Sequence, residues 1–169
     1  MVKLRVSISI ELEGVKEVRP AEDDHEYYFN VMCGSCREQH PKVVSLNMKE
    51  EHEISGSRGS AHFVWRCGNC KKEHSASFIP PSTSSKSTAP IPYSAENGQY
   101  APFIALDCRG LEFTTFHFRG KWLATGEESG TPFEIDFEEG VEEGRWDDYD
   151  EKAEAPVAVS ECKAKIERF

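Results

Sequence analysis

The first fourteen residues, MVKLRVSISIELEG (residues 1–14), decide the fold class of this chain. Apolar side chains alternate with polar or charged ones through six consecutive pairs, from Val2 and Lys3 to Leu12 and Glu13. A period of two is the pattern of a strand that has one buried and one solvent-facing side. The sequence therefore predicts that the chain begins with a long β-strand.

Most of the remaining chain has a similar character. Short runs rich in aromatic and β-branched residues are separated by polar turns, which is typical of strands. Helical periodicity is hard to find in any part of the sequence. The strand-like runs are EYYFNVMC, KVVSLNM, SAHFVWRC, HSASFI, GLEFTTFHF and APVAVSEC. The prediction is a mainly β fold.

A faint internal repeat indicates that the fold has two similar β halves in one compact unit. ISIELEGV (8–15) resembles IALDCRGL (104–111), and Gly14 falls opposite Gly110. Each half would then begin with a strand that turns at a glycine. Between the two copies, PPSTSSKSTAPIP has no apolar pattern to bury and is predicted to be an exposed linker. The predicted divisions are a zinc-binding β half at 1–79, the linker at 80–92 and an acidic β half at 93–169.

The charge of the chain is distributed unevenly. The 169 residues carry a net charge of −10. Residues 1–91 contain 12 basic and 12 acidic side chains, whereas residues 92–169 contain 8 and 18. The acidic half would repel a phosphate backbone, so we expect no nucleic-acid binding. No run approaches the roughly 18–20 apolar residues of a membrane span, and the N-terminus lacks a signal-peptide pattern. We therefore expect no membrane attachment and an intracellular location, in the cytoplasm or also in the nucleus.

Two matched cysteine pairs are the main functional signal. CGSC (33–36) and CGNC (67–70) are separated by 30 residues. Four thiolates in two C-x-x-C pairs match the closed tetrahedral site of a structural Zn²⁺ ion. Each pair lies between two strand-like runs, which predicts a zinc-knuckle pair at the tips of two hairpins. Glycine at the second position of each pair is expected to supply the unusual backbone angles of the turn. The predicted ligands of one Zn²⁺ per chain are Cys33, Cys36, Cys67 and Cys70.

Two alternatives to a structural zinc site stay open. One cysteine pair could be the redox dithiol of a thiol oxidoreductase, although such motifs usually open a helix and neither pair does so here. The zinc could also be exchangeable, because affinity depends on contacts around the ligands that the sequence does not reveal. Four cysteines leave no coordination position for a reactive water molecule, so we expect no enzymatic activity.

The other chemically notable residues have plainer interpretations. His40 and His74 each follow a cysteine pair by four residues and are expected to lie around the site or on the surface. Cys108 and Cys162 are expected to be buried or near-surface thiols without chemistry. The run RWDDYDEKAEA (145–155) is expected to be a solvated acidic strand with aromatic anchors. Its functional alternative is an acidic docking surface for a basic protein partner.

An ordered set of short stretches resembles the eukaryotic CXXC-motif-containing zinc-binding proteins. They span most of the chain: VRP (18–20), CGSC (33–36), GSRGSAHFVWRCGNC (56–70), DCRGLEF (107–113), ESGTPF (128–133) and WDDYDEKA (146–153). The resemblance implies a compact, mainly β protein with two similar halves and one zinc held by the four cysteines. It implies no particular activity. The chain departs from the family pattern at 82–90 and at EEGVEEG (138–144), which look like insertions.

These expectations combine into one functional hypothesis. We expect a monomer that holds one structural zinc ion and has no catalytic activity. It would act by contacting a protein partner, with the acidic second half determining which partner binds.

Overall fold

The computed structural model describes residues 2–138 and 144–169. This described part is made of β-strands and contains no helix, which confirms the predicted mainly β fold. It consequently contains no helix that could cross a membrane. The strands are β1 (Val2–Glu13), β2 (Val15–Pro20), β3 (Tyr27–Cys33), β4 (Val44–Leu46), β5 (His52–Glu53), β6 (Ser60–Ala61), β7 (Phe63–Arg66), β8 (Glu73–Ile79), β9 (Ala101–Arg109), β10 (Leu111–His117), β11 (Lys121–Gly126), β12 (Pro132–Asp136), β13 (Trp146–Asp150) and β14 (Ala155–Arg168).

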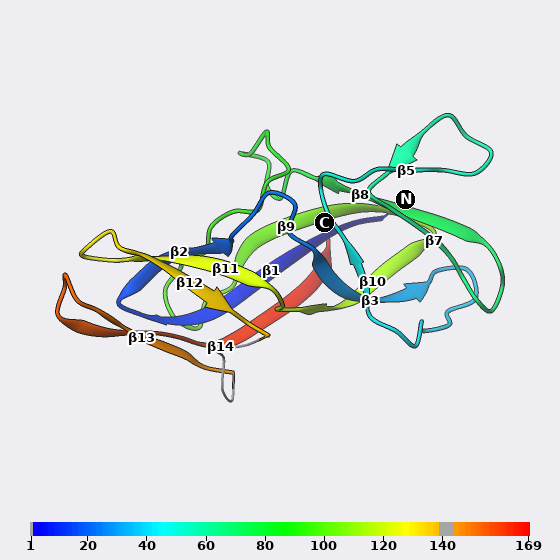
Figure 1. The fold of residues 1–169 in the computed structure, drawn as a ribbon. Helices are drawn as coiled ribbons and strands as arrows, with labels where there is room; N and C mark the ends of the chain where they lie inside the picture. The colour runs from blue at the N-terminus through cyan, green and yellow to red at the C-terminus, as the bar shows by residue number, and fades with distance from the viewer. Residues whose placement is uncertain (1, 139–143) are drawn as a thin grey trace.

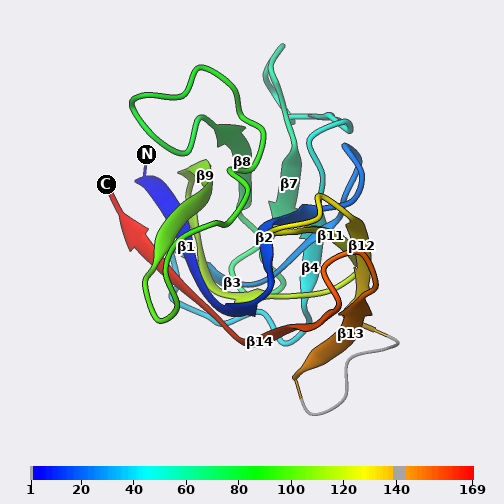
Figure 2. The same cartoon turned by 90° about the vertical axis from the view of Figure 1, so that its left-hand side faces the viewer.

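The strands form one large sheet and several smaller ones. The large sheet has six strands in the order β13-β14-β1-β9-β8-β7. Two three-stranded sheets have the orders β10-β3-β4 and β12-β11-β2, and β5 pairs with β6. Figures 1 and 2 show the sheets curled around a common interior. All the strand pairs are antiparallel.

The sheet orders confirm the two similar halves. The strands of the two halves correspond in pairs: β1 with β9, β2 with β10, β3–β4 with β11–β12, and β7–β8 with β13–β14. If each strand is exchanged with its counterpart, the six-stranded sheet keeps its order and the two three-stranded sheets replace each other. The first strands of the two halves are swapped between them. β1 pairs with β14 and β2 with β11, whereas β9 pairs with β8 and β10 with β3. Each half therefore completes its sheets with strands from the other.

The turn glycines predicted from the internal repeat occupy equivalent places. β1 passes into β2 at Gly14 and β9 passes into β10 at Gly110. Their φ angles are 70° and 85°, in the left-handed region that glycine adopts without a steric penalty. The prediction that each half begins with a strand turning at a glycine is confirmed.

The core lies between the inner faces of the sheets. The alternating apolar residues of β1 point inward, and Val6, Ile8 and Ile10 are at most 1% exposed. Aromatic rings fill the middle, where Phe103 stacks on Trp122 at a centroid distance of 5.3 Å. Each large apolar side chain buried in this way contributes about 2 kcal/mol to folding.

The connection between β8 and β9 is tied to the core at both ends. Near its start, the Arg5 side chain donates a hydrogen bond to the Pro81 carbonyl at 3.0 Å. Near its end, Val18 and Tyr93 exchange backbone hydrogen bonds of 3.0 and 2.8 Å. Tyr93 is 1% exposed. Just before Tyr93, Ile91 N–H also donates to the carbonyl of Phe103 on β9 at 3.0 Å.

The acidic segment at residues 145–155, which the sequence predicts to be a solvated strand, is only partly exposed to solvent. β13 forms an edge of the large sheet, and Asp147 and Asp148 are exposed. Trp146 is buried and anchors the strand, but Tyr149 is 52% exposed and does not. Asp150 is 1% exposed, so the expectation that it is solvated is wrong.

His25 should make the folded state sensitive to mild acid. Burial lowers its pKa to about 4, even though Glu26 and Asp24 act in the opposite direction. Below its ordinary pKa of about 6.5, the unfolded chain binds a proton that the folded chain excludes. Stability should therefore fall by about 2 kcal/mol between pH 7 and pH 5, from this side chain alone. The check is urea unfolding of the wild type and of His25→Phe at both pH values. Equal pH slopes for the two proteins would contradict the prediction.

Candidate metal centre

The two cysteine pairs lie at the tips of two hairpins, as predicted. The first CxxC turn, residues 33–38, follows β3 and returns toward β4. The second CxxC turn, residues 67–72, connects β7 to β8. β3 and β4 belong to a three-stranded sheet, whereas β7 and β8 end the six-stranded sheet. Both turns lie at the right-hand end of Figure 1, so a metal ion between them would fasten two sheets together.

The two turns have the same backbone hydrogen bonds. In each turn, the carbonyl of the first cysteine accepts a hydrogen bond from the N–H of the residue directly after the second cysteine. The N–H of the first cysteine donates to the carbonyl of the residue two positions after the second cysteine. The bonds of the first turn are Arg37 N–H to Cys33 O at 2.9 Å and Cys33 N–H to Glu38 O at 3.0 Å. Those of the second are Lys71 N–H to Cys67 O and Cys67 N–H to Lys72 O, both at 3.0 Å.

The unusual backbone angle of each turn lies at a residue that the sequence did not indicate. Arg37 and Lys71, which directly follow the second cysteines, have φ angles of 65° and 64°. Gly34 and Gly68 are not among the glycines with positive φ. The prediction that these glycines supply the angle is therefore wrong. Nothing in the residue types of Arg37 or Lys71 signals a left-handed conformation, because such angles are uncommon outside glycine and asparagine.

Gly34 is required for a different reason. A Cβ atom at this position would lie 2.8 Å from the Gly110 carbonyl oxygen, whereas at Gly68 it would meet nothing within 4 Å. The Gly34 N–H also donates to that same oxygen at 2.8 Å. We therefore expect Gly34→Ala to lower the free energy of unfolding by about 2 kcal/mol. The matched variant Gly68→Ala should change it by less than about 0.5 kcal/mol. Urea titration of both variants checks this, and equal effects would contradict it.

The four cysteine sulfurs converge on one point. All four Sγ atoms lie within 4.8 Å of one another. Cys33 and Cys70 are 3.6 Å apart, and Cys36 and Cys67 are 3.7 Å apart, so these two close contacts run between the turns. Tetrahedral coordination with Zn–S bonds of about 2.3 Å requires sulfur separations of about 3.8 Å. The donor set therefore fits one tetrahedral Zn²⁺ ion.

The electrostatics of the cluster favour a cation. A hydrogen bond from the Asn69 side chain, with another from the backbone of Glu38, lowers the pKa of Cys36 to about 6. The backbone of Lys72 lowers the pKa of Cys70, but burial and the neighbouring sulfurs outweigh it and raise the value to about 11. Four sulfurs this close together cannot all be ionised unless a positive charge lies between them. A bound divalent ion supplies that positive charge, and the negative charge of the thiolates in turn favours its binding.

His74 supports the cluster from inside the protein. Its Nε2 atom lies 3.1 Å from Cys33 Sγ, and the side chain is 6% exposed. A donor at this position satisfies a sulfur lone pair and fixes the orientation of Cys33. The centroid of the His74 ring lies 5.8 Å from that of Trp65, and the centroid of the His40 ring lies 5.5 Å from the same Trp65 ring. His74 is thus placed around the site, as expected.

Exposure divides the four cysteines into two classes. Cys33 and Cys67, the first of each pair, are 0% and 2% exposed. Cys36 and Cys70 are only partly buried. The cluster is therefore closed toward the core and reachable from solvent on one side. Cys108 is buried on β9 and Cys162 is partly buried on β14, and neither belongs to the cluster.

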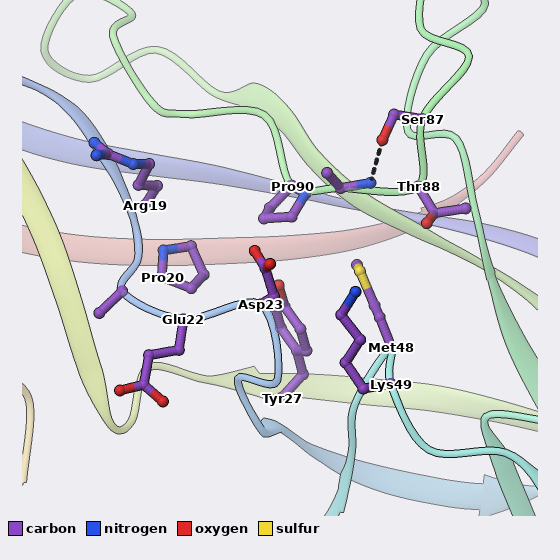
Figure 3. A pocket seen from close by; sticks show the side chains of 12 residues that line it. Arg19, Pro20, Glu22, Asp23, Tyr27, Met48, Lys49, Ser87, Thr88 and Pro90 are labelled. Carbon is purple, nitrogen blue, oxygen red and sulfur yellow. Dashed lines mark hydrogen bonds between the residues drawn. The ribbon is translucent and has the colours of Figure 1, made fainter.

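A separate groove lies between the end of β2 and residues 87–90. It has a volume of about 430 Å³, and Figure 3 shows Asp23 and Lys49 among the side chains that line it. Arg19 and Glu22 add one more charge of each sign, and Tyr27 and Pro90 form apolar walls. Its lining includes no cysteine and no histidine. The groove offers no nucleophile paired with a base, and it is separate from the cysteine cluster.

Comparison with known proteins identifies relatives of the whole chain. The family model for "CXXC motif containing zinc binding protein, eukaryotic" matches residues 5–167. A UPF0587 protein of Schizosaccharomyces pombe is 35% identical over 169 residues, covering 99% of each chain. The human CXXC motif containing zinc binding protein is 32% identical over 162 residues and 95% of each chain.

Solved structures agree with the sequence relatives. The crystal structure of C1orf123 superposes with a TM-score of 0.85 at 31% identity, covering 99% of each chain. A hypothetical protein from Plasmodium falciparum has the same fold, with a TM-score of 0.80 at 21% identity over 99% of this chain and all of that one. The chain belongs to the family of eukaryotic CXXC motif containing zinc binding proteins.

Proposed function

We propose that the protein binds one structural zinc ion through Cys33, Cys36, Cys67 and Cys70. The supporting observation is the convergence of four sulfurs from two turns with the same backbone hydrogen bonds, with Sγ–Sγ distances of 3.6 and 3.7 Å between the turns. The ion fastens the β3–β4 turn of one sheet to the β7–β8 turn of another. Four thiolates complete its coordination, so the site has no position for a substrate or water and the zinc is not catalytic.

The proposed activity is binding to another protein. The surface that supports this proposal lies at the opposite end of the molecule from the cysteines. There, β13 exposes Asp147 and Asp148, and the β11–β12 turn exposes Glu127 and Glu128. A basic surface on a protein partner would complement this end, whereas nucleic acid and anionic membranes would be repelled. The proposal is for a monomer in the cytoplasm or also in the nucleus.

An exchangeable zinc is the second candidate. It is favoured by the partial exposure of Cys36 and Cys70, which a competing ligand could reach from solvent. In that case the protein would hold zinc for transfer. The structural role requires the fold around the site to depend on the ion, and the exchangeable role does not.

Metal analysis of the purified protein, followed by titration with a chelator, separates these functions. Free thiols and circular dichroism are followed together during the titration. A structural site gives one zinc per chain, release of four thiols and loss of the fold around the turns. Release of zinc with the fold intact establishes the exchangeable role. A protein without zinc that forms a reversible disulfide within a pair would contradict both and indicate a thiol oxidoreductase.

The partner proposal has its own test. Immobilised wild-type protein should capture cell proteins that high salt releases, because the contact is electrostatic. The variant Asp147→Lys with Asp148→Lys should lose these proteins while its zinc content stays unchanged. The same captured set for both proteins would contradict a role for the acidic end.

A further inference from the structure

The turns at the two ends of the molecule have the same construction. By the symmetry of the strand order, the β11–β12 turn is the counterpart of the first CxxC turn. The two turns lie at opposite ends of the molecule in Figure 1. In the β11–β12 turn, Gly130 N–H donates to Gly126 O at 2.9 Å, and Gly126 N–H donates to Thr131 O at 2.7 Å. These are the two bonds that close the first CxxC turn, and Gly126 therefore corresponds to Cys33. Gly130, with φ of 72°, corresponds to Arg37.

The β13–β14 turn matches the second CxxC turn in the same way. Asp150 pairs with Ala155 across its base, as Cys67 does with Lys72. Glu154 has a φ angle of 52° at the position of Lys71. The correspondence extends to side chains. Lys152 N–H donates to Asp150 Oδ1 at 3.1 Å, and its equivalent, Asn69 N–H, donates to Cys67 Sγ at 3.4 Å.

The surroundings of the two ends also agree. At the cysteine end, Gly34 N–H donates to Gly110 O at 2.8 Å. At the other end, Glu127 N–H donates to Gly14 O at 2.9 Å, and Gly14 is the counterpart of Gly110. The four cysteine positions and their four counterparts also have the same degree of burial. Gly126 and Asp150 are buried like Cys33 and Cys67, and Ser129 and Ala153 are partly buried like Cys36 and Cys70.

We propose that residues 126–131 and 150–155 form a metal-free counterpart of the zinc site, in which a hydrogen bond between Ser129 and Asp150 replaces the metal ion as the fastener. The four positions equivalent to the cysteine ligands are Gly126, Ser129, Asp150 and Ala153. The Ser129 hydroxyl donates to Asp150 Oδ2. These two residues correspond to Cys36 and Cys67, whose sulfurs make one of the two close contacts between the CxxC turns.

The position of Gly126 supports the correspondence further. A Cβ atom built on Gly126 would point at Ser129 Oγ and at Asp150 Oδ2, the latter at 2.6 Å. A side chain there is thus directed at the centre of the site, as the Cys33 side chain is at the other end. Asp150 is held ionised, because the Ser129 hydrogen bond keeps the pKa of its carboxyl below the ordinary value. The charged hydrogen bond makes the acidic end independent of zinc.

The first test installs the missing ligands. The variant Gly126→Cys, Ser129→Cys, Asp150→Cys, Ala153→Cys should bind two zinc or two cobalt(II) ions per chain where the wild type binds one. Its cobalt form should double the absorption of tetrahedral thiolate coordination. The control places four cysteines in the same turns but at outward positions: Glu127→Cys, Glu128→Cys, Glu151→Cys and Lys152→Cys. A folded quadruple variant with the metal content of the control would overturn the proposal.

The second test does not depend on metal and remains decisive if the quadruple variant fails to fold. Ser129→Ala removes the hydroxyl that Asp150 accepts, so the melting temperature should fall by about 5 °C. Amide exchange should accelerate in residues 126–131 and 150–155 while zinc content stays at the wild-type value. Glu128→Ala, in the same turn but exposed, is the control. A melting temperature for Ser129→Ala within about 1 °C of that control would overturn the hydrogen-bond fastener, whatever the wild type binds at its cysteines.

Discussion

Replacing Cys33 by serine should remove the zinc and unfold one end of the molecule while the other end stays folded. Cys33 is fully buried, and its sulfur lies 3.6 Å from that of Cys70. A structural zinc ion contributes on the order of 10 kcal/mol, which is comparable to the whole stability of a typical domain. The loss should nevertheless be local, because the turns of the acidic end are fastened without metal. We expect zinc content well below one per chain and amide protection lost in β3, β4, β7 and β8 but retained in β11 to β14.

Cys108→Ala is the matched control for this experiment. Cys108 is as buried as Cys33, and burial raises the pKa of its thiol to about 12. It lies outside the cysteine cluster, so its replacement should cost about 1–2 kcal/mol of packing without altering the zinc content. If Cys33→Ser kept its zinc, His74 would be the replacement ligand to examine, since its Nε2 is 3.1 Å from the sulfur. If the double variant Cys33→Ser, His74→Ala also kept its zinc, Cys33 would not be a ligand.

The features that could be predicted from the sequence are those that local patterns encode. The alternation in β1 reports directly on which side chains are buried, and Val6, Ile8 and Ile10 are indeed inside. The hairpin tips at residues 33–36 and 67–70 follow from strand-like runs on both sides of each pair. In both cases neighbouring residues in the sequence are sufficient to determine the geometry.

The features that could not be predicted depend on contacts between distant segments. Gly34 is needed because the Gly110 carbonyl approaches it from another strand, and no local pattern contains that distance. The exchange of β1 and β9 between the halves is also invisible, since both exchanged and unexchanged pairings bury the same alternating residues. The counterpart of the zinc site is not visible in the sequence for a third reason. Its turns carry a serine and an aspartate instead of cysteines, so only the shared backbone reveals the relation.

The acidic segment illustrates how one residue can differ from its neighbours. Asp147 and Asp148 are exposed, as a run of charges predicts, and Asp147 forms an ion pair with Arg145 at 2.8 Å. Asp150, two residues later, is 1% exposed and accepts hydrogen bonds from Ser129 and from the backbone of Lys152 and Ala153. The stretches ESGTPF and WDDYDEKA, which carry part of the family resemblance, meet at this bond. In this chain the two stretches are thus joined by a side-chain hydrogen bond, and their other acidic residues are exposed.

Gly110→Ala should produce the largest effect of any single glycine replacement at the cysteine end. Its φ angle of 85° costs an L-residue about 1–2 kcal/mol. In addition, the new Cβ would overlap the ring of His74, which is buried and lies against Cys33. Displacing that ring removes the donor from the Cys33 sulfur as well as the packing. We expect a combined loss of about 3–4 kcal/mol in the free energy of unfolding, together with faster release of zinc to a chelator.

Gly98→Ala separates the backbone cost from the contact with His74. Gly98 has nearly the same φ angle, 83°, but a Cβ there would meet nothing within 4 Å. Its replacement should therefore cost only the backbone term of about 1–2 kcal/mol and leave the zinc release rate unchanged. Urea unfolding gives the stability of both variants, and thiol release under chelator gives the rate. If the two variants lost equal stability and released zinc at the same rate, the contact between Gly110, His74 and Cys33 would contribute nothing to the metal centre. A faster release in Gly110→Ala alone would instead link the turn between β9 and β10 to retention of the metal.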